Sequence, residues 1–192
     1  MKLFIILTSF CVIASLTQAQ ITTNINWVQK NSKPAEQQVF YDKKRKLTWA
    51  DFLGTPNLPD PVAAITASGF GYSTKISTSN NKGTIVIDIY CNFSKLNSWV
   101  KKDKNTAYIL KHEQHHFDVT YLAAIQFISN VKTAKLTVNN TTYLLADLYK
   151  QSCDYMNNLQ NEYDTQTKNG QIKNKQAEWN AYFEKRLLEV KL

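Results

Sequence analysis

The chain has 192 residues, of which 43% are hydrophobic, and a formal net charge of +8 at pH 7. This length suits one domain with a substantial hydrophobic core. The sequence shows no internal repeat and no low-complexity tract. Its basic residues are dispersed except at Lys43–Lys46, which reads Lys-Lys-Arg-Lys. A cluster of this size is more typical of a solvated loop than of a nucleic-acid surface, so we expect no nucleic-acid partner.

The first 19 residues have the pattern of a secretory signal peptide. A basic residue, Lys2, precedes an apolar run that ends near Leu16, and Thr17 and Ala19 are the small residues that a signal peptidase requires. We expect cleavage after Ala19, a secreted or periplasmic location, and a mature domain over residues 20–192. A lipid-anchored precursor that uses Cys11 is disfavoured, because this cysteine lies within the apolar run.

The mature chain contains no segment long and apolar enough to be an integral membrane span. It keeps two cysteines, Cys91 and Cys153. In an oxidising compartment these two could form one disulfide, and two buried thiols are an equally good interpretation. Their spacing excludes a C-x-x-C redox site or a zinc knuckle. The sequence does not indicate an oligomeric state.

Strand patterns occupy the first half of the mature chain. One edge strand is expected around Ile25–Val28, and two longer strands over Ala63–Ile76 and Gly83–Phe93. The second of these is rich in β-branched and aromatic residues. Ser79–Gly83 between them has the composition of a hairpin turn. The sequence therefore predicts a small antiparallel sheet or hairpin.

Helical periodicity follows the strands. Residues from Ala107 to about Val131 contain no Pro or Gly and carry apolar residues at helical spacing, with Asn105 or Thr106 as the N-cap. A second long helix is expected from Thr141 or Thr142 to about Lys168, and a third from about Lys175 to Val190. Strands followed by helices predict the α+β class, with one sheet and three helices.

The first of these helices contains the sequence H-E-x-x-H. Residues four apart on a helix lie on one face, so His112 and His116 can both ligate one metal ion. Glu113 is then placed as a general base that accepts a proton from a zinc-bound water. The alternative is that one histidine packs in the core and the others face water. Two histidines at this spacing within a core helix favour the metal site and a zincin-like active-site helix.

A catalytic zinc ion takes three protein ligands, and the sequence has no histidine left to be the third. His115 is rotated about 100° from His116 and points aside, as a surface or supporting residue. The metzincin continuation is absent, because Val119 and Leu122 stand where its Gly and third His would be. Asp118 points to the opposite side of the helix. We therefore expect the third ligand to be a carboxylate on another element.

A short connector makes the first two long helices antiparallel neighbours. Counting from this connector, Glu162 and Asp164 lie at the level of the histidines, and both remain candidates. The apolar stripe of the second helix passes nearer Glu162, whereas Asp164 belongs to a polar face beside it, which favours Asp164 as the metal ligand. Tyr163 is either a catalytic residue that stabilises an oxyanion or a buried aromatic.

With these residues in view, the chain resembles a family of bacterial proteins described as predicted secreted zinc-dependent proteases. The resemblance spans most of the mature chain, and its most specific part is the block His112–Asp118. The other matching pieces are weak singly but occur in the same order: Leu47–Phe52 with Gly54 and Pro56, Ala63–Thr66, Ser98–Val100, and Tyr163–Thr167 with Gly170, Gln176 and Trp179.

The resemblance implies an exported metallopeptidase-like fold, with His112 and His116 as metal ligands and Glu113 as the catalytic acid and base. In such proteins a histidine precedes the glycine that follows the Tyr-Asp segment, and here that position is Asn169. We therefore expect an exported zinc-dependent hydrolase, a metallopeptidase with a peptide or protein substrate. The alternative is a non-catalytic envelope binding protein with a structural or degenerate metal site.

Overall fold

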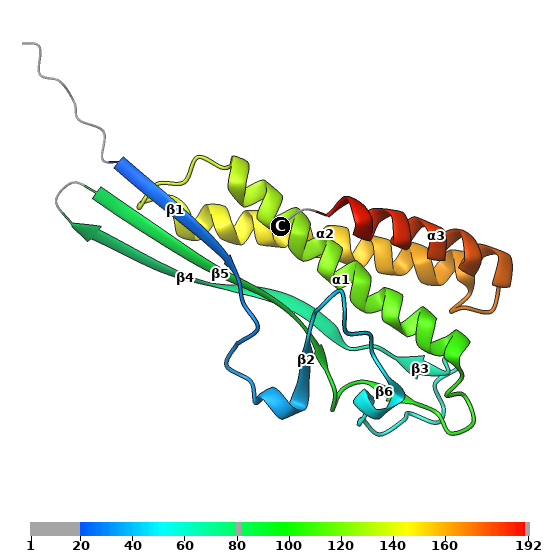
Figure 1. The fold of residues 1–192 in the computed structure, drawn as a ribbon. Coiled ribbons are helices and arrows are strands. Elements are labelled where there is room, and N and C mark those ends of the chain that lie inside the picture. Colours follow the sequence, from blue (N-terminus) through cyan, green and yellow to red (C-terminus); the bar gives the residue numbers. More distant parts are fainter. Residues whose placement is uncertain (1–19, 80–81, 191–192) are drawn as a thin grey trace, which may run out of the picture.

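The structure is a computed structural model that describes residues 20–79 and 82–190. Strands come first and three helices follow, which confirms the predicted α+β class (Figure 1). The expected signal peptide lies outside the described residues. The strands are β1 Gln20–Trp27, β2 Gln38–Phe40, β3 Ala64–Ile65, β4 Ser68–Ser79, β5 Lys82–Ser94 and β6 Trp99–Val100.

Strand β5 is the centre of the main sheet. β4 pairs with it antiparallel along almost its whole length, from Ser68 opposite Phe93 to Ser79 opposite Lys82. The opposite edge of β5 is shared: β1 pairs parallel with its first part, and β2 pairs antiparallel with Asn92–Ser94. The hairpin is as the sequence predicts, whereas the parallel partner β1 is longer than the edge strand expected there.

A second, two-stranded sheet forms where β3 pairs antiparallel with β6. Its residue Ala64 is opposite Val100, and Ile65 is opposite Trp99. The loop between β5 and β6 is held by Ser98, whose hydroxyl donates to the Ser94 carbonyl and accepts the N–H of Ala67. The small sheet therefore lies close to the start of the first long helix, as Figure 1 shows.

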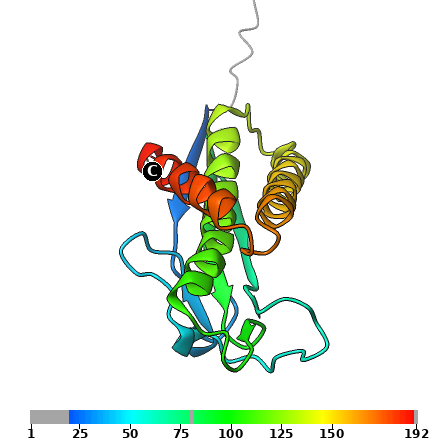
Figure 2. The same cartoon turned by 90° about the vertical axis from the view of Figure 1, so that its right-hand side faces the viewer.

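The three helices are α1 Ala107–Thr133, α2 Thr141–Thr167 and α3 Lys173–Glu189, close to the predicted ranges. α1 begins at the predicted cap, since the Thr106 hydroxyl oxygen accepts the N–H of Ile109. α1 packs on β4 and β5, while α2 and α3 flank it on its other sides (Figure 2). Being surrounded in this way, α1 buries most of its residues from His112 to Val131.

Apolar side chains from the sheet, from the loop before it and from α1 form the main core. Ile85, Ile87 and Ile89 alternate inward along β5 and are fully buried, as a strand with one face on helices requires. A smaller cluster joins α1, α2 and α3 through Leu122, Leu159, Tyr163, Trp179 and Phe183. This second cluster fixes the three helices at the end of α1 that carries the H-E-x-x-H sequence.

A buried carboxylate, Asp118, ties α1 to the segment after β2. Its Oδ1 accepts hydrogen bonds from the Tyr41 hydroxyl at 2.8 Å and from the Gln114 side chain at 3.0 Å, and its Oδ2 lies 3.0 Å from His115 Nδ1. Burial alone would raise the pKa of Asp118, but the bond from His115 and the charge of Lys46 lower it. Asp118 is thus an ionised structural anchor that points away from His112.

Cys91 and Cys153 are unpaired thiols. Cys91 is buried, as the second interpretation expects, whereas Cys153 is only partly buried. Burial raises the pKa of the Cys91 thiol well above its ordinary value. Within residues 20–79 and 82–190, none of the helices is both long and apolar enough to cross a membrane.

We predict that Asp118→Ala lowers the free energy of unfolding by about 3 kcal/mol, because it leaves the buried Tyr41 hydroxyl, Gln114 amide and His115 ring without their common acceptor. Urea unfolding followed by circular dichroism measures this change. The matched control is Asp147→Ala, which removes an exposed carboxylate bonded to Gln151 and should change stability by no more than about 0.5 kcal/mol. Equal effects of the two variants would contradict the anchoring role.

Candidate metal centre

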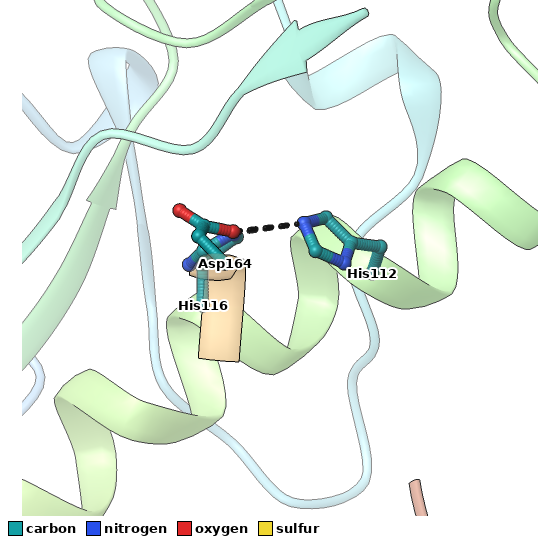
Figure 3. Close-up of side chains that lie close together, drawn as sticks. All are labelled: His112, His116 and Asp164. Atoms are coloured by element: carbon teal, nitrogen blue, oxygen red, sulfur yellow. Dashed lines mark hydrogen bonds and ion pairs between the residues drawn. The ribbon is translucent and has the colours of Figure 1, made fainter. Parts of the chain in front are cut away.

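His112 and His116 converge as their spacing predicts. One turn of α1 separates them, and their Nε2 atoms lie 3.2 Å apart, with the two rings nearly perpendicular at 84°. His112 is buried and His116 is partly buried. The two nitrogens therefore point at one place beside the helix (Figure 3).

The third member of the site is Asp164 of α2, the residue that we favoured because it belongs to the polar face of that helix. Its Oδ1 is 3.2 Å from His112 Nε2 and 3.1 Å from His116 Nε2. The other candidate, Glu162, is exposed and accepts a hydrogen bond from Gln166 on its own helix. The antiparallel packing of α1 and α2 thus selects Asp164.

The three donor atoms have the separations that a bound metal requires. They form a triangle with sides of 3.1 to 3.2 Å. In tetrahedral coordination with bonds of about 2.0 Å, two ligand atoms lie about 3.3 Å apart. The group His112, His116 and Asp164 could therefore hold one metal ion with little movement, and it leaves a fourth position for a further ligand.

Two glutamines set the tautomers of the histidines. Gln160 Nε2 donates to the His116 carbonyl, so its Oε1 faces His116 Nδ1 as an acceptor. Gln176 Nε2 donates to Asn180 Oδ1 and to the Tyr163 hydroxyl, so its Oε1 faces His112 Nδ1 at 2.9 Å. Each Nδ1 must then carry the proton of the neutral ring. This leaves both Nε2 lone pairs directed at the metal position.

The arrangement of a buried carboxylate oxygen beside two imidazole nitrogens favours the binding of a cation. Asp164 Oδ1 is buried and, within the part of the chain that the structure describes, has no partner with hydrogen-bond geometry, although two Nε2 atoms lie beside it. Burial lowers the pKa of His116, but the contact with Asp164 and the charges of Glu113 and Asp164 outweigh this and raise it to about 9. A metal ion would therefore compete with one proton for this position.

Glu113 lies beside the metal position and is held by Thr66. The Thr66 hydroxyl is 2.7 Å from Glu113 Oε2 and 3.1 Å from the Glu113 carbonyl oxygen. Glu113 and Thr66 line the same cavity as His112 and His116. The segment just after β3 thus orients the carboxylate that the sequence placed as general base.

Tyr163 lies behind His112 rather than in the cavity. Its ring stacks on the imidazole with centroids 4.6 Å apart, and its hydroxyl accepts a hydrogen bond from Gln176 at 2.6 Å. Burial is the main cause that raises its pKa far above the ordinary tyrosine value. The position suits a support for His112, which is the buried-aromatic alternative, and Tyr163 is not among the described residues that line the cavity.

His115 is buried in a network that supports the ligands. Its ring stacks on Phe183, and its Nε2 lies 3.0 Å from Asn180 Oδ1, the same oxygen that accepts from Gln176. Contacts thus run from Asp118 through His115, Asn180 and Gln176 to His112. Of the two expectations for His115, the structure agrees with the supporting residue. The side chain is buried and does not lie at the surface.

The turn between α2 and α3 lies against the His112 ring and forms part of the cavity wall. Lys168, Asn169 and Gly170 all have positive φ, at 49°, 51° and 79°. A Cβ added at Gly170 would lie 3.3 Å from His112 Nδ1, so the position favours glycine for its conformation and for this close approach. Asn169, which stands where the resembled family has His, lines the cavity beside Gly170.

A cavity of about 580 Å³ opens onto the metal position. Its walls come from the segment that includes β3, from the first turns of α1, from α2 and from the turn that leads into α3. This volume is within the usual range for ligand pockets. The metal position, Glu113 and the cavity therefore form one continuous site.

Comparison of the chain with protein-family models, with curated proteins and with solved structures gives no match.

We predict that the protein binds one divalent metal ion per chain and that Asp164→Ala weakens zinc binding by more than about 100-fold, because it removes one of three ligands. Titration of zinc against a chromophoric chelator measures the affinity. The matched control is Glu162→Ala, which removes an acid two residues away on an exposed face and should leave the affinity unchanged. Equal losses in both variants would show that Asp164 is not a ligand.

Proposed function

We propose that the protein is a zinc-dependent hydrolase, and specifically a metallopeptidase. The observation that carries the proposal is the convergence of two imidazole Nε2 atoms and one carboxylate oxygen at 3.1 to 3.2 Å beside a buried glutamate in a cavity. The H-E-x-x-H sequence on α1 and the resemblance to secreted zinc-dependent proteases support it.

Zinc is the metal that suits this donor set. Two imidazoles and one carboxylate with an open fourth position are typical of catalytic zinc sites, and imidazole donors disfavour magnesium and calcium. A sulfur donor is absent from the group, since Cys91 and Cys153 lie elsewhere. When bound, zinc supplies a Lewis acid that polarises a carbonyl and lowers the pKa of a coordinated water.

Glu113 moves the proton in this mechanism. Its carboxylate takes a proton from the attacking water as the carbonyl carbon is attacked, and returns that proton to the nitrogen of the leaving amine. The Thr66 hydroxyl fixes the orientation of the carboxylate by its bond to Oε2. Gln160 and Gln176 face the Nδ1 atoms and so present Nε2 of each neutral ring as the ligand nitrogen, which makes them positioning residues.

The strand that lines one wall of the cavity supports a peptide substrate. Ala64 and Ile65 of β3 form part of its wall, so strand backbone runs past the metal position. Extended peptides bind well beside such strands, since backbone groups give affinity and side-chain pockets give specificity. We further propose that the protein acts outside the cytoplasm, on the basis of the signal-peptide pattern of residues 1–19.

The test is Glu113→Gln, which keeps the size of the side chain and removes the base. We predict that zinc remains at one ion per chain while hydrolysis of a mixed peptide library falls by at least about 10²-fold. Mass spectrometry of the cleaved library and metal analysis are the two measurements. Undiminished cleavage by this variant would assign the activity to another group, and a zinc-loaded wild-type protein that cleaves nothing would favour the non-catalytic envelope protein.

A further inference from the structure

The cavity has an uneven distribution of charge. Three lysines line it, Lys101, Lys104 and Lys173. The acidic residues among its described lining are Glu113 and Asp164, and both lie at the metal position. Away from the metal, the walls of the cavity are therefore positively charged. Any ligand that extends from the metal toward the start of α1 meets these lysines.

Two of the three lysines have their charge available. Across residues 20–79 and 82–190, neither Lys104 nor Lys173 has an ion-pair partner within 4.0 Å, and both are exposed. Lys101 is different, because its ammonium group donates to the Asp60 carbonyl and so secures the loop before β3. Lys104 and Lys173 are thus the cations that a ligand can reach.

The helix ends add to this positive field. Lys104 lies just before the start of α1, and Lys173 is the first residue of α3. The N-terminus of α3 has no side-chain cap, so N–H groups of its first turn remain without an internal acceptor. Both helix dipoles direct their positive ends to the region of the two lysines, which strengthens the attraction for an anion.

We propose that the substrate is an acidic peptide, with a carboxylate that Lys104 and Lys173 bind at a distance from the bond that is cleaved. From Thr106 to His112 is about 9 Å along the helix, which corresponds to two or three residues of an extended peptide. This inference rests on the proposed peptidase function and names its substrate class. The carboxylate belongs either to an Asp or Glu side chain or to the peptide C-terminus.

The rest of the lining favours a peptide over a polyanion such as a nucleic acid. Val62, Ile65, Tyr108 and Ile109 supply apolar surface to the same cavity, and Tyr108 is fixed by its bond to the Gly170 carbonyl. A phosphate backbone would bury charge against this surface, whereas a peptide can place apolar side chains on it. The selectivity is therefore for an acidic residue within an otherwise ordinary peptide.

The experiment measures binding in the absence of turnover. Zinc-loaded Glu113→Gln protein is titrated with fluorescent peptides that differ in one feature: a Glu or a Gln two or three residues from the centre, and a free or an amidated C-terminus. Fluorescence anisotropy gives each affinity. The double variant K104Q/K173Q is compared with the control K75Q/K135Q, whose two exposed lysines lie outside the cavity lining.

The proposal expects one carboxylate-bearing peptide to bind about tenfold more tightly than its neutral partner at an ionic strength of about 0.01 M, with a smaller difference at about 0.15 M. K104Q/K173Q should abolish the difference and K75Q/K135Q should keep it. The proposal is overturned if both peptides of each pair bind equally, if K104Q/K173Q keeps the preference, or if inorganic polyphosphate of the same charge binds as tightly as the acidic peptide.

A cleavage assay of the wild-type zinc-loaded protein on the same peptides, run beside the binding measurement, separates the inference from the proposed function. Charge-selective binding together with a wild-type protein that cleaves none of the peptides would contradict the peptidase function and leave acidic-peptide recognition standing. Cleavage of both acidic and neutral peptides at equal kcat/KM would have the opposite meaning, because the enzyme would be confirmed and its proposed specificity would be wrong.

Discussion

Two imidazole lone pairs and a carboxylate oxygen meet at one point in this molecule, and they repel one another unless a cation lies between them. The repulsion is strong because His112 is buried and Asp164 Oδ1 is shielded from water. A proton on His116 can relieve it, as the raised pKa of that residue shows, and a metal ion with three coordinate bonds can relieve it better. The surrounding structure is arranged to maintain this meeting point.

Each helix supplies one part of that arrangement. α1 carries both histidines on one face, and its Asp118 accepts a hydrogen bond from Tyr41 of the segment after β2. α2 brings Asp164, and the turn after it places Gly170 against the His112 ring. α3 brings Gln176, whose oxygen orients that ring. The packing of the three helices therefore determines the relative positions of the three donor atoms, and the segment that includes β3 forms one wall of the cavity beside them.

The parts of this site that depend on local sequence could be predicted. Helical periodicity gave the limits of α1 within two residues at its C-terminus, and the spacing of His112 and His116 gave their common direction. Asp164 could be found because antiparallel helices pair residues equidistant from their connector. Sequence alone assigns no role to Gln176, since it reaches His112 only through the turn between α2 and α3, where three successive residues have positive φ.

Two other features, the parallel pairing of β1 and the orientation of the Tyr163 hydroxyl, cannot be predicted from a pattern of residues. β1 pairs parallel with β5, and long-range pairing of this kind depends on the path of the intervening chain rather than on strand propensity. Tyr163 could be placed near the histidines, but whether its hydroxyl faced the cavity or the core depended on the partner that α3 supplies. In both cases the missing information is the relative position of two elements far apart in the sequence.

The measurement that tests the central claim most directly is X-ray absorption spectroscopy at the zinc edge of the zinc-loaded protein. We expect a first shell of nitrogen and oxygen atoms at about 2.0 Å, with the outer-shell scattering of two imidazole rings per zinc ion. A shell that contains sulfur at about 2.3 Å, or one without the scattering of two imidazoles, would contradict the assignment of His112, His116 and Asp164 as the metal site.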